Sequence, residues 1–81
     1  MIYDILIKPR ALKDLKSLPK PMRQRIIEKL EALRNDLAGD VKRLTDFTPE
    51  YRLRVGDYRV LFEVEEKNVV VYRVVNRKDA Y

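Results

Sequence analysis

The last third of the chain concentrates arginines in a stretch whose pattern predicts consecutive short strands. These arginines are Arg52, Arg54, Arg59, Arg73 and Arg77. A guanidinium group stays charged at physiological pH, and its planar fork of N–H donors matches the oxygens of a phosphate. Arginines spaced along strands in this way therefore indicate a surface that binds phosphate groups.

The alternation of side chains predicts which face these arginines share. Successive side chains of a strand point to opposite faces of the sheet. In residues 51–55 apolar side chains at the odd positions alternate with Arg52 and Arg54. In residues 58–64 an apolar side chain occupies every even position, and Arg59 lies opposite. If both apolar faces pack on a common core, the arginines converge on the open face of one sheet.

Such a face suits the cleavage of RNA, which carries its own nucleophile, the 2′-hydroxyl. Cleavage needs a base for that hydroxyl, positive charge for the phosphorus centre and an acid for the leaving 5′-oxygen. The arginines supply the positive charge. Tyr81, if it lies beside Arg59 and Arg77, is one candidate base, because neighbouring cations favour a phenolate. Glu63 has the parity of Arg59 and is the other candidate; its alternative role is an ion pair that orients an arginine.

The composition excludes several other kinds of site. The chain has 81 residues with no histidine and no cysteine, which rules out disulfides, cysteine- or histidine-based metal sites and histidine-dependent triads. Its carboxylates are scattered and it has two glycines, so neither a metal site nor a glycine-rich phosphate loop is predicted, and no cofactor is expected. The net charge of +5 favours a polyanionic partner, although charge alone more often marks only a solvated basic surface.

The length of the chain fits one domain, residues 1–81. The N-terminus alternates as a strand does, without the apolar run of a signal peptide. No stretch approaches the length of a membrane span. We therefore expect a single cytoplasmic domain that has no membrane partner.

The elements that position the arginines are predicted from periodicity, prolines and glycines. Strands are expected at residues 2–7, 51–55, 58–64 and 69–75, and helices at residues 9–18 and 21–37. Gly39 is expected to cap the second helix, Gly56 to lie in a hairpin turn, and Tyr72 to point inward. Residues 40–50 are predicted to be a loop and residues 77–81 a short polar tail.

The resulting order is β-α-α-β-β-β, an α+β fold. Two helices joined by a proline-containing turn are typical of a helical hairpin. The N-terminal strand and this hairpin are expected to pack on one face of an antiparallel sheet, which leaves the other face to the arginines.

Motifs in both halves of the chain resemble those of the RelE/ParE superfamily of bacterial and archaeal toxins, and of its RelE branch in particular. The segment YRLRVGDYRVLFEV, followed by VVVYRVVNRKDAY, is similar to the family pattern Y-R-[IL]-R-x-G-x-Y-R-[IVL]-[IVL]-Y and a later strand that ends in G-H-R-x-x-x-Y. The segment IKPRALKDLKSLPKPMRQRI resembles the family's opening strand and helical hairpin. The resemblance covers nearly the whole chain and implies a fold like that of small microbial ribonucleases.

The resemblance also implies an activity. RelE toxins are metal-independent endoribonucleases that enter the ribosomal A site and cleave messenger RNA there. By this resemblance Arg59 stabilises the transition state, Arg77 lies near the leaving group, and Tyr81 acts as a base or stacks on a nucleobase. The residues expected to contact RNA and the ribosome are Arg52, Arg54 and Arg73.

The chain departs from the family pattern near its end. Asn76 stands where His or Lys is frequent, so a general-acid role would pass to Arg77 or to ribosomal groups. Val75 replaces the usual Gly. Tyr81 is the last residue of the sequence, so its own carboxylate is expected to place a negative charge close to the arginines.

The resemblance implies a cognate antitoxin as a partner, together with the ribosome and messenger RNA. DNA would be contacted only indirectly, through the antitoxin. Two alternatives remain open. One is a ParE-like toxin that binds and inhibits DNA gyrase, which the retained set of basic residues disfavours. The other is a non-catalytic RNA-binding domain whose arginines only position phosphates.

Overall fold

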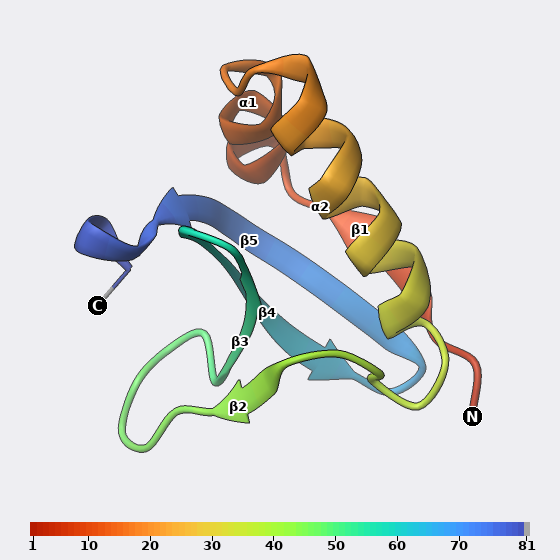
Figure 1. The fold of residues 1–81 in the computed structure, drawn as a ribbon. Coiled ribbons are helices and arrows are strands. Elements are labelled where there is room, and N and C mark those ends of the chain that lie inside the picture. Colours follow the sequence, from red (N-terminus) through yellow and green to blue (C-terminus); the bar gives the residue numbers. More distant parts are fainter. Residues whose placement is uncertain (81) are drawn as a thin grey trace.

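The computed structural model describes residues 1–80 as a five-stranded sheet with two helices on one face (Figure 1). The strands are β1 (Asp4–Ile7), β2 (Val41–Arg43), β3 (Tyr51–Val55), β4 (Tyr58–Glu65) and β5 (Asn68–Asn76). The helices are α1 (Pro9–Lys16), α2 (Lys20–Leu33) and the short 3₁₀ helix η1 (Arg77–Asp79). The predicted α+β class is confirmed. No helix within residues 1–80 has the length and apolar character that crossing a membrane requires.

The strand order in the sheet is β1-β5-β4-β3-β2. Strands β2 to β5 form an antiparallel meander, and β1 lies parallel to β5 at the far edge. The N-terminal strand is shorter than predicted, because Ile2 forms only an isolated bridge to Asn35. The prediction of a simple loop for residues 40–50 was wrong, since β2 lies within them. β2 has three residues, of which only Val41 is apolar, so periodicity gives no indication of it.

Prolines limit both helices as the sequence predicts. Pro9 occupies the first turn of α1, where its missing N–H removes no hydrogen bond. Pro19 directly precedes α2, and Pro21 lies in the first turn of that helix. α2 ends at Leu33, about one turn before its predicted end, so Gly39 does not cap it. Asp36 and Leu37 adopt positive φ angles of 52° and 58° and turn the chain. Leu37 still packs against the core, which explains why the apolar period outlasts the helix.

The core lies between the helices and the sheet, and the faces predicted for β3 and β4 are confirmed. Tyr51 and Phe62 stack on this face with ring centroids 5.4 Å apart. The buried side chains that join the helices to the sheet include Ala11, Leu15, Ile26, Leu30, Leu33, Leu53, Val60, Phe62 and Val71. In a chain without cysteine, this burial of hydrocarbon is the main favourable term in folding.

A β-bulge changes the faces of β5. Leu61 pairs with Arg73, but the next residue of β4, Phe62, pairs with Val71. Tyr72 is therefore the extra residue, and the prediction that it points into the core was wrong. Lys8 Nζ lies 5.6 Å from the centroid of the Tyr72 ring, and the Tyr72 hydroxyl donates a hydrogen bond to Glu65 at 3.5 Å. An inserted residue shifts the alternation of side chains by one position. A prediction that assumes strict alternation along the strand does not detect this shift.

Gly39 closes the turn after α2 in a conformation that favours glycine. Its φ angle is +134°, and a Cβ at this position would lie 2.9 Å from Cδ1 of Leu53. We expect Gly39→Ala to lower the free energy of unfolding by about 1–3 kcal/mol, because the backbone is strained for an L-residue and the buried leucine must move. Urea unfolding measures this loss. Ala38→Ser, at the exposed neighbouring position, is the control and should change the same quantity by less than about 0.5 kcal/mol; equal effects of the two changes would contradict the prediction.

Candidate functional site

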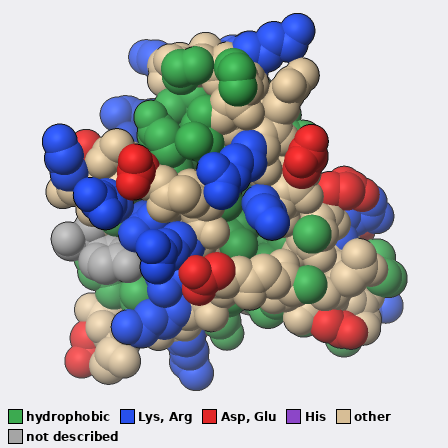
Figure 2. All heavy atoms as spheres, in the orientation of Figure 1, with side chains coloured by type: hydrophobic (Ala, Val, Ile, Leu, Met, Phe, Trp, Pro, Cys, Tyr) green, Lys and Arg blue, Asp and Glu red, His purple; other side chains and the backbone are tan. Residues whose placement is uncertain are grey.

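The β3–β4 hairpin and the end of β5 bring three of the predicted arginines together. Arg54 stands directly opposite Arg59 in the register of β3 and β4, and Arg59 pairs with Val75 of β5. Arg77 follows β5 immediately, and its backbone N–H donates to the carbonyl of Asp57 at 2.8 Å. We call Arg54, Arg59 and Arg77 the arginine cluster. Figure 2 shows Lys and Arg side chains gathered on this side of the molecule.

Within residues 1–80, backbone carbonyls are the only groups that bind the guanidinium of Arg59. Its Nη1 donates to Gly56 at 2.9 Å and to Tyr58 at 3.0 Å. Gly56 has a φ angle of +57°, the left-handed conformation that a tight hairpin turn requires. The carbonyls fix the direction of the Arg59 side chain without neutralising its charge, so the charge remains available to an anion.

The other two members of the cluster are also poorly neutralised. Arg54 is exposed, and its side chain makes no ion pair or hydrogen bond within residues 1–80. Arg77 Nε lies 3.9 Å from the carboxylate of Asp57, with side chains 62% and 72% exposed. A pair this open to water contributes little energy. Like charges directly opposite each other destabilise a sheet, so the unneutralised pair of Arg54 and Arg59 is typical of a functional surface.

Local structure at the end of β5 positions Arg77. The side-chain oxygen of Asn76 accepts a hydrogen bond from the backbone N–H of Lys78 at 3.1 Å, which caps η1. Ala80 is buried, with 5% of its surface exposed. Residues 77–79 are polar and exposed, as predicted for a short polar tail, but they form a 3₁₀ helix that leads to the buried Ala80. Asn76, at a position where the family often has His or Lys, therefore has a structural role in directing the chain to Arg77.

Arg52 belongs to a different set of contacts from the cluster. Its Nη1 donates to the backbone oxygen of Asp40 at 2.8 Å and to the Asp40 carboxylate at 3.1 Å. Only 14% of the Arg52 side chain is exposed. The pair fastens the start of β2 to β3, so this charge is satisfied within the fold.

Arg73 is likewise paired, with Asp14 of α1. The Asp14 carboxylate accepts hydrogen bonds from Arg73 Nε at 2.8 Å, from Arg73 Nη2 at 3.3 Å and from the backbone N–H of Val74 at 2.9 Å. β1 ends opposite Val71, so Asp14 supplies the acceptor that a neighbouring strand would otherwise give. Burial raises the pKa of Asp14, but the hydrogen bonds from Arg73 and Val74 and the charge of Arg73 outweigh it and lower that pKa overall.

Of the two candidate bases, Glu63 and Tyr81, the structure describes only Glu63. Glu63 Oε1 accepts a hydrogen bond from the backbone N–H of Glu50 at 3.0 Å, which fastens the start of β3. The ion pair to an arginine that was expected for Glu63 is absent within residues 1–80. Tyr81 lies outside the described residues. Burial and the carboxylates of Glu65 and Glu63 raise the pKa of Tyr72, which makes Tyr72 a poor base at neutral pH.

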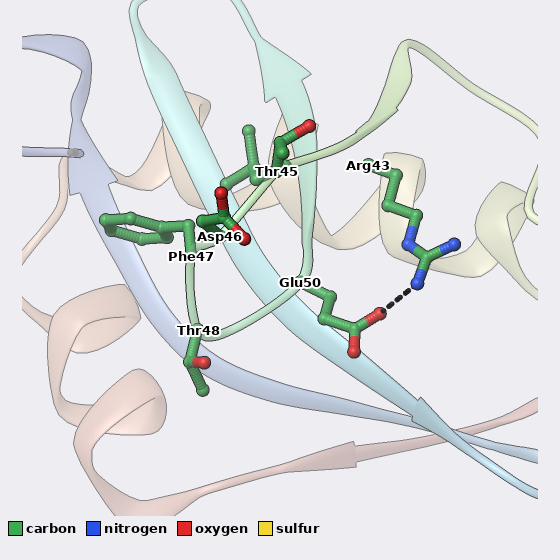
Figure 3. Close-up of a pocket in the computed structure, with 7 residues that line it drawn as sticks. Arg43, Thr45, Asp46, Phe47, Thr48 and Glu50 are labelled. Carbon is green, nitrogen blue, oxygen red and sulfur yellow. Dashed lines mark ion pairs between the residues drawn. The ribbon is translucent and has the colours of Figure 1, made fainter.

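A separate hollow of about 660 Å³ lies under the loop between β2 and β3 (Figure 3). Its lining residues are Arg43, Leu44, Thr45, Asp46, Phe47, Thr48 and Glu50. The one basic group in it, Arg43, is paired with Glu50 at 3.3 Å. The basic group of this hollow is already paired, so the arginine cluster is the better candidate for a phosphate site. No group of three or more carboxylates in residues 1–80 is arranged to hold a metal ion.

One further basic residue reaches the hairpin turn from the helical layer. A Cβ on Gly56 would lie 3.3 Å from Nη1 of Arg25, a residue of α2. The sequence pattern gives no indication of this approach, because nothing in it relates Arg25 to a turn 31 positions later.

The family described as ParE toxin of type II toxin–antitoxin system, parDE, matches residues 5–81. The chain belongs to this toxin family. Toxin RelE3 of Methanocaldococcus jannaschii is 35% identical to it over 82 residues, which cover 95% of this chain and 93% of the relative. The chain is thus a RelE-like toxin of a type II toxin–antitoxin system, as the resemblance implied.

Solved structures of RelE toxins share the fold. The RelB–RelE antitoxin–toxin complex from Methanococcus jannaschii matches with 34% identity and a TM-score of 0.77 over 94% of each chain. The archaeal RelE–RelB complex from Pyrococcus horikoshii OT3 matches with 31% identity and a TM-score of 0.79, covering 99% of this chain and 100% of that one. The two helices on a five-stranded sheet are therefore the architecture of this toxin family.

Proposed function

We propose that this toxin is a ribosome-dependent endoribonuclease that cleaves messenger RNA in the A site. The observation that carries the proposal is the arginine cluster, because three arginines lie together at the β3–β4 end of the sheet and, within residues 1–80, only Asp57 pairs with one of them, at 3.9 Å. A surface built in this way is matched to the phosphodiester backbone and to the additional negative charge of its transition state.

In the proposed reaction the 2′-hydroxyl attacks the adjacent phosphorus. A base removes the hydroxyl proton, the new O2′–P bond forms, the P–O5′ bond breaks, and a proton passes to the leaving 5′-oxygen. The products are a 2′,3′-cyclic phosphate and a 5′-hydroxyl end. We assign transition-state stabilisation to Arg59, the leaving-group side to Arg77, and substrate phosphate binding to Arg54. Tyr81 remains the proposed base, with Glu63 as the alternative.

The two paired arginines have a smaller part in this proposal. Arg52 and Arg73 were expected to contact RNA or the ribosome, but each guanidinium is already bound to a carboxylate, of Asp40 and Asp14 respectively. We assign them first to the fold. Arg52→Gln and Arg73→Gln should therefore act on stability before they act on cleavage.

We also propose that a cognate antitoxin holds the toxin inactive. The matched structures from Methanococcus jannaschii and Pyrococcus horikoshii are complexes of RelE with RelB. An acidic antitoxin segment that covers the arginine cluster would neutralise its charge and exclude RNA from it. DNA would then be contacted through the antitoxin.

The test is to induce the toxin in cells without its antitoxin and to map the new ends of messenger RNA. The proposal requires discrete cuts in register with codons, which depend on translation of the cleaved message. The matched family is described by its ParE toxins, so inhibition of DNA gyrase is the second candidate. Lost supercoiling activity with intact messages would favour that candidate, and RNA binding without either effect would favour the non-catalytic domain.

A further inference from the structure

α2 contributes a fourth guanidinium group to the end of the sheet where the cluster lies. A Cβ on Gly56 would lie 3.3 Å from Nη1 and 3.8 Å from Cζ of Arg25, and 4.0 Å from Cε of Met22. The side chain of Arg25 therefore extends along the β3–β4 turn. Arg25 is exposed and makes no ion pair or side-chain hydrogen bond within residues 1–80, so no partner in the described fold explains its position.

Arg25 and Arg59 approach the same glycine from two elements. Arg59 Nη1 donates to the carbonyl of Gly56 at 2.9 Å, while Arg25 Nη1 lies close to its α-carbon. Ordinary bond lengths place the two Nη1 atoms within about 10 Å of each other. One guanidinium is therefore able to hold the reacting phosphate while the other holds a neighbouring phosphate of the same strand.

The electrostatics at the turn point to an anion. Within residues 1–80, Arg25 adds to the charges of Arg54 and Arg59, which no carboxylate pairs with, and to that of Arg77, which Asp57 pairs with at 3.9 Å. Asp57 supplies the only carboxylate of the turn itself. Bringing a further cation to this place is unfavourable unless an anion is bound between the cations. Gly56 accordingly meets two demands, because it adopts a positive φ angle and leaves the space beside Arg25 open.

We propose that Arg25 binds the substrate phosphate next to the scissile one, which makes α2 part of the RNA site. This inference rests on the proposed endoribonuclease function. The structure gives Arg25 a binding role, since Arg59 and Arg77 already occupy the proposed positions around the reacting phosphate. Loss of Arg25 should therefore raise KM and leave kcat nearly unchanged.

The experiment measures cleavage of a defined messenger RNA on programmed ribosomes, with the toxin released from its antitoxin. We expect Arg25→Gln to raise KM by about fivefold to tenfold, as for one charge-assisted contact open to solvent. Arg25→Lys keeps the charge but loses the planar fork, so its KM should fall between those of Arg25→Gln and the wild type. Lys29→Gln is the matched control, because it removes the same charge from an exposed position one turn further along α2.

Salt dependence gives a second readout that a purely structural role would not change. Each phosphate contact to a single strand contributes about 0.7 to the slope of log affinity against log salt concentration. Binding of the toxin to a single-stranded RNA, measured by fluorescence anisotropy, should lose about this much slope in Arg25→Gln. Arg25→Lys should retain the slope of the wild type.

The results separate this inference from the function it rests on. If the wild type cleaves and Arg25→Gln keeps its KM and salt slope, Arg25 does not contact RNA. A fall in kcat at constant KM would also overturn the binding role. If the wild type cleaves nothing, the proposed function fails, and the anisotropy series still decides whether Arg25 contacts RNA. A rise in KM or a loss of slope that is equally large in Lys29→Gln would show only a diffuse effect of net charge and would overturn the site.

Discussion

Replacement of Arg59 by glutamine is expected to lower the rate constant of messenger RNA cleavage by about 10²–10³-fold, the usual consequence of removing one preorganised group that stabilises transition-state charge. Two backbone carbonyls hold the guanidinium of Arg59, at 2.9 and 3.0 Å, and no carboxylate within residues 1–80 neutralises it. The side chain is thus oriented before substrate arrives. Single-turnover cleavage on programmed ribosomes measures the loss directly.

A matched control for this change is Arg43→Gln. Arg43 is also a strand arginine, but it lies on β2, is paired with Glu50 at 3.3 Å and has 71% of its side chain exposed. Its removal should change the cleavage rate by less than about threefold, because an exposed ion pair contributes little. Cleavage by Arg59→Gln at the wild-type rate, with a normal thermal unfolding midpoint, would contradict the role assigned to Arg59.

Stability should change far less than activity at this position. Arg54 and Arg59 face each other across two strands, and opposed like charges destabilise a sheet. Arg59→Gln removes that repulsion, but it also removes the hydrogen bonds to the carbonyls of Gly56 and Tyr58, so the two effects oppose each other in the free energy of unfolding. An inactive variant that unfolds at a temperature near that of the wild type is what a site maintained for function predicts.

The sequence was sufficient to predict the faces of the central strands. Buried apolar side chains recur at every second residue of each strand, at Leu53 and Val55 in β3 and at Val60 and Phe62 in β4. Arg54 and Arg59 have the opposite parity in their strands. A regular pattern of this kind has a single geometric consequence, because a strand exposes alternate residues on opposite faces. The sequence alone therefore predicted that Arg54 and Arg59 lie on the same face of the sheet.

The sequence pattern did not predict the features that interrupt this two-residue or helical period. The bulge at Tyr72 inserts one residue and shifts the alternation, and the turn at Leu37 continues an apolar period after the helix has ended. In both places tertiary packing, and not the local pattern, decides the conformation. The same residue types at the same spacing allow a regular strand or a longer helix.

Long-range pairing decided which predicted site residues take part in the cluster. Arg52 and Arg73 have the same chemistry as Arg59, but their partners Asp40 and Asp14 lie 12 and 59 positions away. A sequence pattern shows that an arginine is present but not whether a distant carboxylate has already neutralised it. The approach of Arg25 to Gly56 is hidden for the same reason.

The contact between α1 and β5 should be the most acid-sensitive part of the fold. We expect Asp14→Asn to lower the free energy of unfolding at neutral pH by about 1.5–2 kcal/mol, because two hydrogen bonds from Arg73 and one from Val74 then meet an uncharged amide. This is the lower end of the range for charged hydrogen bonds, since 37% of the Arg73 side chain is exposed and solvent screens the pair. Urea unfolding of the two proteins at pH 7 measures the difference.

The same carboxylate determines how this difference depends on pH. The pKa of Asp14 is lower in the folded protein than its ordinary value of 3.8, so the folded state binds fewer protons than the unfolded state. The stabilisation is fully present above the unfolded pKa and is lost as the pH falls through the folded pKa. The stability gap between wild type and Asp14→Asn should therefore stay constant from pH 7 down to about pH 5 and close in stronger acid. Asp79→Asn, an exposed carboxylate of η1, is the control and should show no such gap; a gap for Asp14→Asn that persists at pH 2 would mean that Asp14 acts through its shape and not through its charge.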